Sequence, residues 1–404
     1  MERIRVAMIG TKGMPATIGG VERHVEALSQ RLVAGGFSVT VYGRSWYLDR
    51  HPGTERTYRG VRVVVLQSVR TKHLDAISHT FLATLHAMRE RADVYHFHGV
   101  GPALLAWMPR VFRPRSTVFV TFHSVDRLHA KWGIVARAML TIGEWAACTF
   151  PHETIAVGEV LTAYCTARYG AHPVCIANGV AEPSPAARSR AAQDMLRSHG
   201  ITPKRYLFVA SRLVAHKEIH TVIRAFRQLR RERPDLGGIQ LVIAGSPTFT
   251  EQYEEELRVA ASGDPAVLFL GQRSGLMLEA LFANALAFVH ASRSEGLPLA
   301  VLEAAAAGTM PIVSDIPEHR EVIARIGGML FETGNMWDLL CKLEVALSGA
   351  AHLARIGGDA QRAVLRHYHW DRIAVCTAER YRAHTVNRYA RVHALSPRLV
   401  RSAV

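Results

Sequence analysis

The sequence has 404 residues, more than the roughly 150 of a typical domain, so two domains are the default expectation. Its 49% hydrophobic and 21% charged residues exclude a mainly disordered chain. The formal net charge of +15 attracts anions such as nucleotides, nucleic acid or an acidic membrane surface. The five cysteines show no CxxC spacing, which argues against a disulfide framework or a cysteine zinc site and favours a reducing cytoplasm.

The apolar segments do not indicate export or membrane insertion. The run Val6–Gly10 is too short for a secretory signal. The longest apolar stretch, Gly133–Phe150, is interrupted by Arg137 and Glu144, which favours a buried helix over a membrane span. We therefore expect a cytoplasmic protein that is soluble or peripheral at the inner face of a membrane.

Short apolar runs alternate with helical patterns in the first half. Apolar residues recur at helical spacing over Val21–Ala34, which predicts a helix there. Such alternation is typical of a parallel sheet with both faces covered. The expected strands are Arg5–Ile9, Ser38–Tyr42, Val61–Leu66, Val94–His98, Thr117–Thr121 and Thr154–Val157.

The pattern breaks at Ala181–Arg190, where two prolines and no apolar periodicity indicate a linker. A late helix is expected over Trp370–Arg388, packing back onto the first domain. The predicted fold class is α/β, with two facing Rossmann-like doubly wound domains and ligands at the carboxyl ends of their strands. The domains are residues 1–182, joined by the C-terminal helix 371–404, and residues 183–370. The second set of strands is Tyr206–Ala210, Gln240–Ala244, Val267–Leu270, Ala287–His290 and Pro311–Ser314.

The strongest local motif is SEGLPLAVLEA at 294–304. Glu295 lies at a strand-to-helix turn, and Glu303 lies about two turns into the helix. The glycine allows close approach to a ligand, and the proline suits a first helical turn. A helix start of this kind binds anions or sugar hydroxyls, whereas a capping glutamate followed by a surface glutamate is the simpler alternative.

Two cations follow the strand that ends at Ala210. Arg212 can bind a phosphate through two hydrogen bonds, and Lys217 supplies a point charge. A leaving diphosphate needs both neutralised charge and fixed orientation. Solvated surface charges are the alternative interpretation.

Glycines open the first expected helix. Gly10–Gly13 and Gly19–Gly20 follow the first strand, where free N–H groups favour phosphate. The pattern is neither GxGxxG nor a P-loop, and a tight turn explains it nearly as well.

Two histidines end neighbouring strands of the first half. His98 and His123 would face the proposed cleft and hydrogen-bond to substrate, with Asp126 close by on the acceptor side. With His96 they could suggest a metal, but no carboxylate shares their spacing, so no metal is expected.

The C-terminus is basic. Six arginines and no acid follow Glu379: Arg380, Arg382, Arg388, Arg391, Arg398 and Arg401. A solvated tail and contact with an anionic membrane surface both remain open. Nucleic-acid binding is not expected, because the basic residues are not clustered with aromatic residues on one element.

In this order, the motifs resemble the family 4 retaining glycosyltransferases of GT-B architecture. Glu295 and Glu303, Arg212 with Lys217, and Asn178-Gly179 with Gly19-Gly20 carry the resemblance, which covers nearly the whole chain. First-half segments further resemble a rhamnosyltransferase-type subgroup of polysaccharide biosynthesis. They are IGTKGMP at 9–15, VTVY at 39–42, HTFLAT at 79–84, HGVGP at 98–102 and AKWG at 130–133.

The resemblance implies a role for each motif. Arg212 and Lys217 would hold the donor diphosphate, and Glu303 the ribose. Glu295, with the N–H groups of Gly296 and Leu297, would hold the donor sugar. Gly19 and Gly20 would lie near the phosphates and His123 near the sugar: catalytic roles fall to Arg212, Lys217, Glu295 and His123.

The resemblance implies transfer of a hexose or deoxyhexose from a nucleoside diphosphate sugar to a glycan or lipid-linked acceptor, with no metal and no cofactor. The resemblance also implies a front-face retaining mechanism, in which the departing phosphate takes the acceptor's proton. The lack of a clear pair of carboxylates bracketing the reaction agrees with it. The chain departs from the subgroup at HSVDR (123–127), where His-Gly-Leu-Asp-Trp is usual. A nucleotide-sugar epimerase and a non-catalytic nucleotide-sugar-binding protein remain alternatives.

Overall fold

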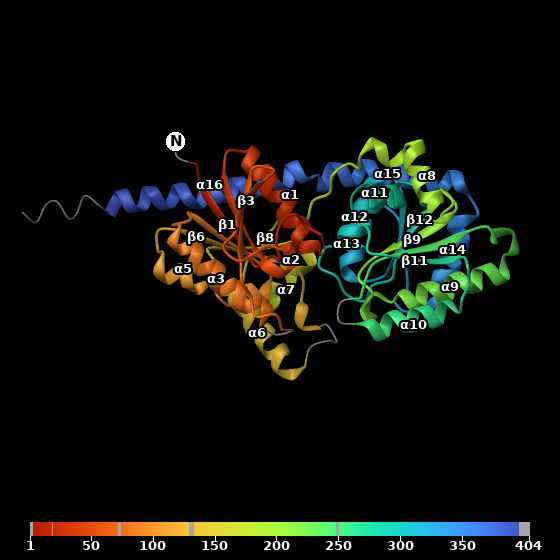
Figure 1. Cartoon of the computed structure of the whole chain (residues 1–404), viewed down its shortest axis with the longest axis horizontal. Coiled ribbons are helices and arrows are strands. Elements are labelled where there is room, and N and C mark those ends of the chain that lie inside the picture. Colours follow the sequence, from red (N-terminus) through yellow and green to blue (C-terminus); the bar gives the residue numbers. More distant parts are fainter. Residues whose placement is uncertain (1–2, 18, 72–73, 129–132, 248–249, 396–404) are drawn as a thin grey trace, which may run out of the picture. The chain divides into compact units, whose positions relative to one another are not determined.

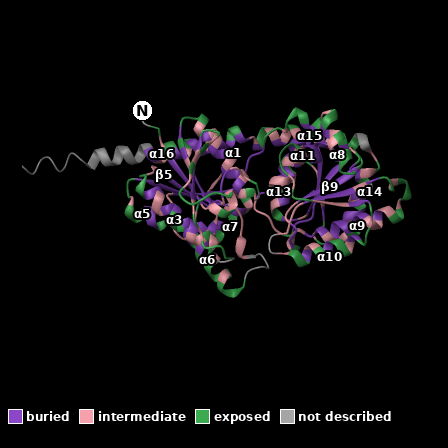
Figure 2. Cartoon of the chain, in the orientation of Figure 1, coloured by how far each residue is buried: buried purple, intermediate pink, exposed green. Residues whose placement is uncertain are grey.

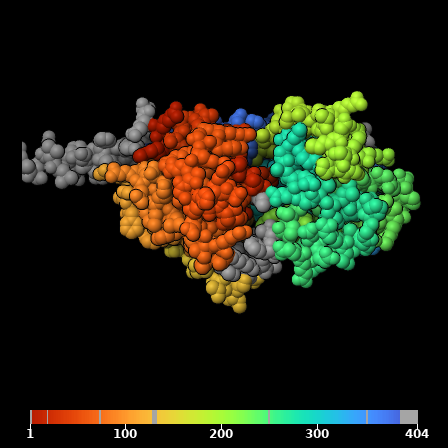
Figure 3. Space-filling view, in the orientation of Figure 1, coloured from red at the N-terminus to blue at the C-terminus, as the bar shows by residue number. Residues whose placement is uncertain are grey.

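The computed structural model describes residues 3–395 except 18, 72–73, 129–132 and 248–249. The chain divides into unit 1, Met1–Asn178 with Trp370–Val404, and unit 2, Gly179–His369. The sequence-based boundaries, after residues 182 and 370, lie within a few residues of these positions. Each unit forms one compact body, unit 1 in red to orange and unit 2 in green to cyan (Figure 3).

Unit 1 is built on an eight-stranded sheet of order β3-β4-β2-β1-β5-β6-β7-β8. All neighbours are parallel except β3, which runs antiparallel to β4. The six strands expected here are confirmed with shifts of one or two residues at their ends. The strands are β1 (Arg5–Ile9), β2 (Ser38–Arg44), β3 (Glu55–Tyr58), β4 (Val61–Leu66), β5 (Val94–His98), β6 (Thr117–Phe122), β7 (Glu153–Ala156) and β8 (Val174–Cys175).

Helices cover the sheet of unit 1. Helices α1 and α16 pack together over a core that includes Val6 and Met8 of β1, Leu28 of α1 and Tyr381 of α16. Helices α3, α4, α5 and α6 form a second packed group (Figure 1). The late helix therefore packs on the first unit, as expected. The helices are α1 (Gly20–Ala34), α2 (Ser45–Leu48), α3 (Asp75–Arg89), α4 (Val100–Ala103), α5 (Trp107–Phe112), α6 (Ile134–Thr149), α7 (Glu159–Tyr169) and α16 (Trp370–Leu395).

Unit 2 contains a six-stranded parallel sheet of order β11-β10-β9-β12-β13-β14. Its five expected strands are confirmed. Figure 2 shows the strands of both sheets largely buried. The strands are β9 (Tyr206–Ala210), β10 (Gln240–Ala244), β11 (Val267–Gly271), β12 (Ala287–His290), β13 (Met310–Ser314) and β14 (Met329–Phe331).

The core of unit 2 lies between the sheet and its helices. Leu207 and Val209 of β9 pack with Phe226 and Leu229 of α9, and burying each such large side chain contributes about 1.5–3 kcal/mol. The helices are α8 (Arg190–Ser198), α9 (Ile219–Glu232), α10 (Glu251–Ala261), α11 (Gly275–Ala283), α12 (Leu299–Ala306), α13 (Pro317–Ile326), α14 (Met336–Leu347) and α15 (Ala350–Tyr368).

The expected linker at 181–190 is a folded part of unit 2, so that expectation was wrong. Ala187 is buried, and its carbonyl accepts a hydrogen bond from Asn284 Nδ2 at 2.9 Å. Arg188 donates to the carbonyl of Ala307 at 2.6 Å. The segment contains a one-turn 3-10 helix, Pro185–Arg188, and the Ser184 hydroxyl before it accepts a hydrogen bond from the Ala186 N–H.

The apolar stretch at 133–150 forms helix α6, but the expectation that it is buried was wrong. Ile134 and Val135 are 87% and 79% exposed. Only the face around Gly143 packs closely: a Cβ there would lie 2.4 Å from the Val100 carbonyl oxygen. Among the described residues, no helix combines the length and the apolar character that crossing a membrane requires.

Part of the basic C-terminal segment is held within unit 1. Arg380 forms an ion pair with Glu153 at 2.6 Å, and Arg382 donates to the Gly35 carbonyl at 3.1 Å. Arg388, Arg391, Arg398 and Arg401 lie outside the residues whose side chains the structure describes, as do residues 130–132 of the AKWG segment.

Candidate functional site

The loops that follow parallel strands lie at one edge of each sheet, and in unit 2 hydrogen bonds join two of these loops. The Arg293 N–H, after β12, donates to the His216 carbonyl, after β9, at 2.8 Å. Ser314 at the end of β13 donates its hydroxyl to the Ser292 carbonyl at 2.5 Å. The segments that carry Lys217 and Glu295 are thus fixed against each other.

Glu295 is the centre of the polar group at this edge. Its carboxylate forms an ion pair with Lys217, which lies in the 3-10 turn Ala215–Lys217. Nε2 of His290, the last residue of β12, lies 2.6 Å from Oε1 of Glu295. The Glu295 side chain is only 12% exposed. The structure therefore brings together two residues of the sequence-based site, Lys217 and Glu295, and adds His290.

Electrostatics keep Glu295 ionised. Burial alone would raise its pKa, but the Lys217 charge and the His290 hydrogen bond outweigh burial and hold the pKa well below its usual range. His319 of α13 lies beside them: ring nitrogens of His290 and His319 and an oxygen of Glu295 are within 4.8 Å of one another. Burial lowers the pKa of His319 to about 3, so this imidazole is neutral.

The other predicted donor residues of unit 2 lie in the segments that follow β9 and β12. Arg212 follows β9, is half-buried, and its guanidinium forms no hydrogen bond or ion pair with any residue the structure describes. Gly296 and Leu297 lie in the loop before α12, with Leu297 buried. Glu303 lies within α12 and is half-buried, and it takes no part in the Lys217 ion pair.

In unit 1, His98 and His123 meet at the carboxyl edge of the sheet. His98 is the last residue of β5 and His123 directly follows the adjacent strand β6. Nδ1 of His98 lies 3.3 Å from Nε2 of His123. Nε2 of His98 lies 3.4 Å from Sδ of Met8. The two histidines singled out in the sequence therefore interact directly.

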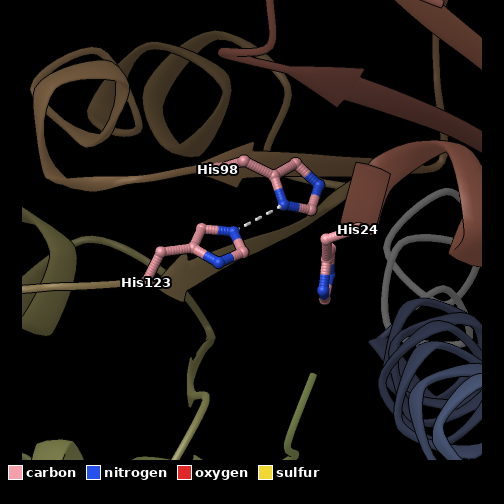
Figure 4. A group of neighbouring side chains, drawn as sticks. All are labelled: His24, His98 and His123. Carbon is pink, nitrogen blue, oxygen red and sulfur yellow. Dashed lines mark hydrogen bonds between the residues drawn. The ribbon is translucent and has the colours of Figure 1, made fainter. Parts of the chain in front are cut away.

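A third histidine, His24 of α1, joins them (Figure 4). Its ring centroid is 5.5 Å from that of His98 and 4.9 Å from that of His123. Its Nδ1–H donates to Oδ1 of Asn178 at 2.9 Å. The sequence analysis did not identify His24. In the sequence it is only a polar residue between Val21 and Val25 of the apolar stripe, a pattern that does not by itself indicate a site.

These three imidazoles are neutral. Burial lowers the pKa of His24 to about 4, although the Asn178 hydrogen bond acts in the opposite direction. Burial, with the neighbouring histidines, holds the pKa values of His98 and His123 well below the usual range.

His96 belongs to the core. Its Nδ1 contacts the Tyr381 hydroxyl of α16, and its Nε2 lies 2.7 Å from Oγ1 of Thr121. Both ring nitrogens therefore have partners, and burial lowers the pKa of His96 to about 3.

The glycine loop opens α1 as expected. Gly19 has φ +108° and directly precedes the helix. The carboxylate of Glu22 lies against it and accepts a hydrogen bond from the Lys12 N–H at 3.1 Å. The loop therefore lies against the carboxylate of Glu22, a residue of the helix that the loop opens.

The segment at 123–127, where the chain departs from the resembled subgroup, contacts α6. Ser124 donates to Oδ1 of Asp126 at 2.6 Å. Arg127 forms an ion pair with the buried carboxylate of Glu144 at 3.2 Å, and that carboxylate also accepts from Tyr164 at 2.7 Å. Arg127 therefore compensates a buried charge of unit 1.

Comparisons with known proteins agree with this architecture. Residues 18–182 match the family described as Glycosyltransferase Family 4, and residues 192–363 match Glycosyl transferases group 1. The chain is 28% identical to a glycogen synthase of Mycobacterium tuberculosis over 94% of this chain and 95% of that protein. It is 35% identical to the sulfoquinovosyl transferase SQD2 of Arabidopsis thaliana over 29% of this chain and 24% of that protein.

Solved structures share the fold. Sucrose-phosphate synthase from Thermosynechococcus elongatus has a TM-score of 0.80 at 18% identity, covering 95% of this chain and all of that one. Anabaena Alr3699/HepE, solved in complex with UDP and glucose, has a TM-score of 0.75 at 17% identity, covering 94% and 100%. The two Rossmann-like units and the two matched segments lead to one conclusion: the chain belongs to the GT-B glycosyltransferases, with a family 4 segment in unit 1 and a group 1 segment in unit 2.

Proposed function

We propose that the chain transfers a hexose or deoxyhexose from a nucleoside diphosphate sugar to a glycan or a lipid-linked saccharide, with retention of anomeric configuration. The Lys217–Glu295–His290 group is the observation that carries this proposal, together with the guanidinium of Arg212, unpaired among the described residues, in the segment between β9 and the Lys217 turn. Family membership and the glycogen synthase relative support it. The HepE complex with UDP-glucose supports a uridine donor as the first to test.

The positive charges at the carboxyl edge of the unit 2 sheet suit a nucleoside diphosphate donor. Arg212 has no competing partner among the described residues, so its guanidinium is available to bind a diphosphate through two hydrogen bonds. Lys217 has three N–H donors and one carboxylate partner, which leaves donors for phosphate oxygens. Glu303 of α12 is proposed to hold the ribose.

Glu295 is proposed to hold the donor sugar rather than attack it. Its carboxylate accepts from Lys217 and His290, and such a committed carboxylate is a poor nucleophile. It can still accept a sugar hydroxyl through its remaining lone pairs. Gly296 and Leu297 would add backbone N–H donors.

The chemistry then rests on the leaving phosphate. The bond from the anomeric carbon to the phosphate oxygen breaks, and the acceptor oxygen bonds to the same face of that carbon. The acceptor proton passes to the departing phosphate oxygen, and Arg212 and Lys217 stabilise the charge that develops there. His98, His123 and Asp126 of unit 1, with Gly19 and Gly20, are proposed on the acceptor and sugar side. No cofactor is part of this proposal.

A donor panel tests the proposal. The full chain is incubated with UDP-glucose, GDP-mannose and dTDP-rhamnose, each with and without a lipid-linked saccharide, and nucleoside diphosphate release is measured. We expect release that depends on the acceptor, with one preferred donor, and a product whose anomeric proton coupling shows retention.

Three outcomes would contradict parts of the proposal. Conversion of the donor without any acceptor would indicate an epimerase. Tight donor binding without release would indicate a binding protein. An inverted linkage would exclude the front-face step. Vesicle sedimentation of the full chain with anionic and neutral lipids tests the separate prediction that the C-terminal arginines contact a membrane.

A further inference from the structure

We propose that His24, His98 and His123 form a binding site for a divalent transition-metal ion of the zinc type, with a fourth coordination position open. The three side chains come from α1, β5 and the loop after β6, all within unit 1. One ligand atom of each lies within 4.8 Å of the others. This site goes beyond the proposed transfer reaction, for which no metal was expected.

The spacing of the first pair fits tetrahedral coordination. Zinc binds imidazole nitrogen at about 2.0–2.1 Å, so two such nitrogens at a tetrahedral angle lie about 3.3–3.4 Å apart. Nδ1 of His98 and Nε2 of His123 are 3.3 Å apart. An ion can therefore bind both nitrogens with little movement of either ring.

His24 supplies the third ligand. Its Nδ1–H is held by Asn178, so its Nε2 carries the lone pair. That Nε2 is buried without a hydrogen-bond partner among the described residues. A buried nitrogen without a partner is destabilising, and coordination to a metal would remove that cost. Figure 4 shows the His24 ring beside the other two.

The surrounding groups fix the tautomers that a metal requires. Metal-bound histidines normally donate their second N–H to a neighbouring acceptor. His24 donates to Asn178, and Nε2–H of His98 has Sδ of Met8 at 3.4 Å. His123 can carry its hydrogen on Nδ1, which leaves Nε2 for the metal. Burial keeps all three rings neutral, the form that ligates.

The chemistry of the donor set points to zinc-like ions. Three neutral imidazoles suit Zn²⁺, Co²⁺ or Ni²⁺, whereas Mg²⁺ and Ca²⁺ prefer oxygen ligands. Three protein ligands leave a position for water or a substrate oxygen. The second group of this size in the described residues, His290 with Glu295 and His319, already contains the Lys217 ammonium, which disfavours another cation there.

Zinc binding is measured on the metal-stripped full chain without a histidine tag, by competition with a chromophoric chelator. We expect one zinc per chain. His24→Gln should weaken binding by about 100-fold or more, and Asn178→Ala by about 10- to 100-fold, the usual effect of losing a supporting partner. His172→Gln, which removes an exposed histidine of unit 1, should leave affinity unchanged.

X-ray absorption of the zinc-loaded wild-type chain tests the site even where a variant fails to fold. We expect three imidazole nitrogens at about 2.0–2.1 Å. Zinc bound with fewer than two imidazoles, equal affinity in wild type and a folded His24→Gln variant, or no binding at micromolar zinc would each overturn the proposal. None of these readouts requires turnover, so they are independent of the transfer reaction.

Discussion

At the carboxyl edge of the sheet in unit 2, Glu295 is ionised between Lys217 and His290, whereas at the same edge of the sheet in unit 1, His24, His98 and His123 are neutral. Both groups are largely shielded from solvent, His123 less than the others, and this burial opposes charge in both. In unit 2 the Lys217 ammonium outweighs burial. In unit 1 the nearest ionisable neighbours are other histidines, so burial prevails.

The comparison separates two kinds of chemistry on one architecture. Fixed opposite charges suit a diphosphate and the hydroxyls of a sugar, because their field is already oriented before the ligand binds. Neutral imidazoles suit hydrogen bonding or metal ligation. Residues at the strand ends, in the loops that follow them and on α1 decide which kind each edge carries.

The largest expected effect is the loss of kcat from a substitution at the charged edge of the unit 2 sheet. Arg212→Ala should lower kcat by about 10²- to 10³-fold, the usual cost of removing one donor that stabilises developing charge. Circular dichroism should show an intact fold, since the Arg212 guanidinium has no partner among the described residues. Arg231→Ala, at an exposed position of α9, is the matched control and should retain wild-type kcat. Normal turnover in Arg212→Ala would remove this residue from the leaving-group role.

The second effect tests the ion pair itself. Glu295→Gln leaves the Lys217 ammonium without its carboxylate, and breaking such a buried pair costs about 3–5 kcal/mol. We expect the lower end of that range in urea unfolding at pH 7, because the amide still accepts hydrogen bonds. Glu255→Gln, at an exposed position of α10, should change the free energy of unfolding by less than about 0.5 kcal/mol.

The stability difference between wild type and Glu295→Gln should depend on pH in a direction set by the Glu295 pKa. The pKa of Glu295 is lowered in the folded chain relative to about 4.3 in the unfolded chain. Its stabilising contribution is therefore complete above the unfolded value and is lost as the pH falls through the folded value. The difference between wild type and Glu295→Gln should be constant from pH 7 to 5 and shrink below about pH 4. A difference that disappears near pH 6 would contradict the assignment to Glu295.

A substitution among the neutral histidines of unit 1 should lower activity less than Arg212→Ala does. His123→Asn would remove the hydrogen bond to substrate that we propose for this residue, worth about 1.4 kcal/mol, and should then lower kcat/KM about tenfold. The free energy of unfolding should change little, since His123 is only half-buried. His172→Asn is the control. A loss as large as that of Arg212→Ala would mean that unit 1 carries part of the chemistry.

Much of the fold follows from the sequence, because buried parallel strands are apolar runs between turn residues. Strands β3, β8 and β14 were missed. β3 reads Glu-Arg-Thr-Tyr, without an apolar run, while β8 and β14 contain two and three residues. Such short edge strands are fixed by pairing with a neighbour, which local sequence does not encode.

The site, like the fold, has residues that the sequence predicts and residues that it does not. Lys217 and Glu295 lie in local motifs, so their chemistry could be predicted. His24 and His319 reach their partners only through the packing of helices on the sheet, and among 21 histidines no spacing singles them out. His290 ends a strand, as His98 does, so the same reasoning would have found it. Exposure of α6 was missed because composition does not show which face of a helix meets the core.

A smaller effect than that of Glu295→Gln concerns Arg127, which stands where the resembled rhamnosyltransferase-type subgroup usually has tryptophan. Arg127→Trp removes the guanidinium from Glu144, whose side chain is fully buried. The hydroxyls of Tyr164 and Tyr169 still donate to that carboxylate, both at 2.7 Å. We therefore expect a loss of about 1–2 kcal/mol in urea unfolding, below the 3–5 kcal/mol of an uncompensated buried charge.

Because Arg127 compensates a structural charge, its replacement should leave the ranking of donors unchanged in the sugar panel. Adding Glu144→Gln to Arg127→Trp should recover much of the lost stability, since a neutral amide needs no cation, and the two substitutions are then non-additive. A changed donor ranking in a stable Arg127→Trp variant would place this position in sugar selection. Selectivity would then lie in unit 1 as well as at the charged edge of unit 2.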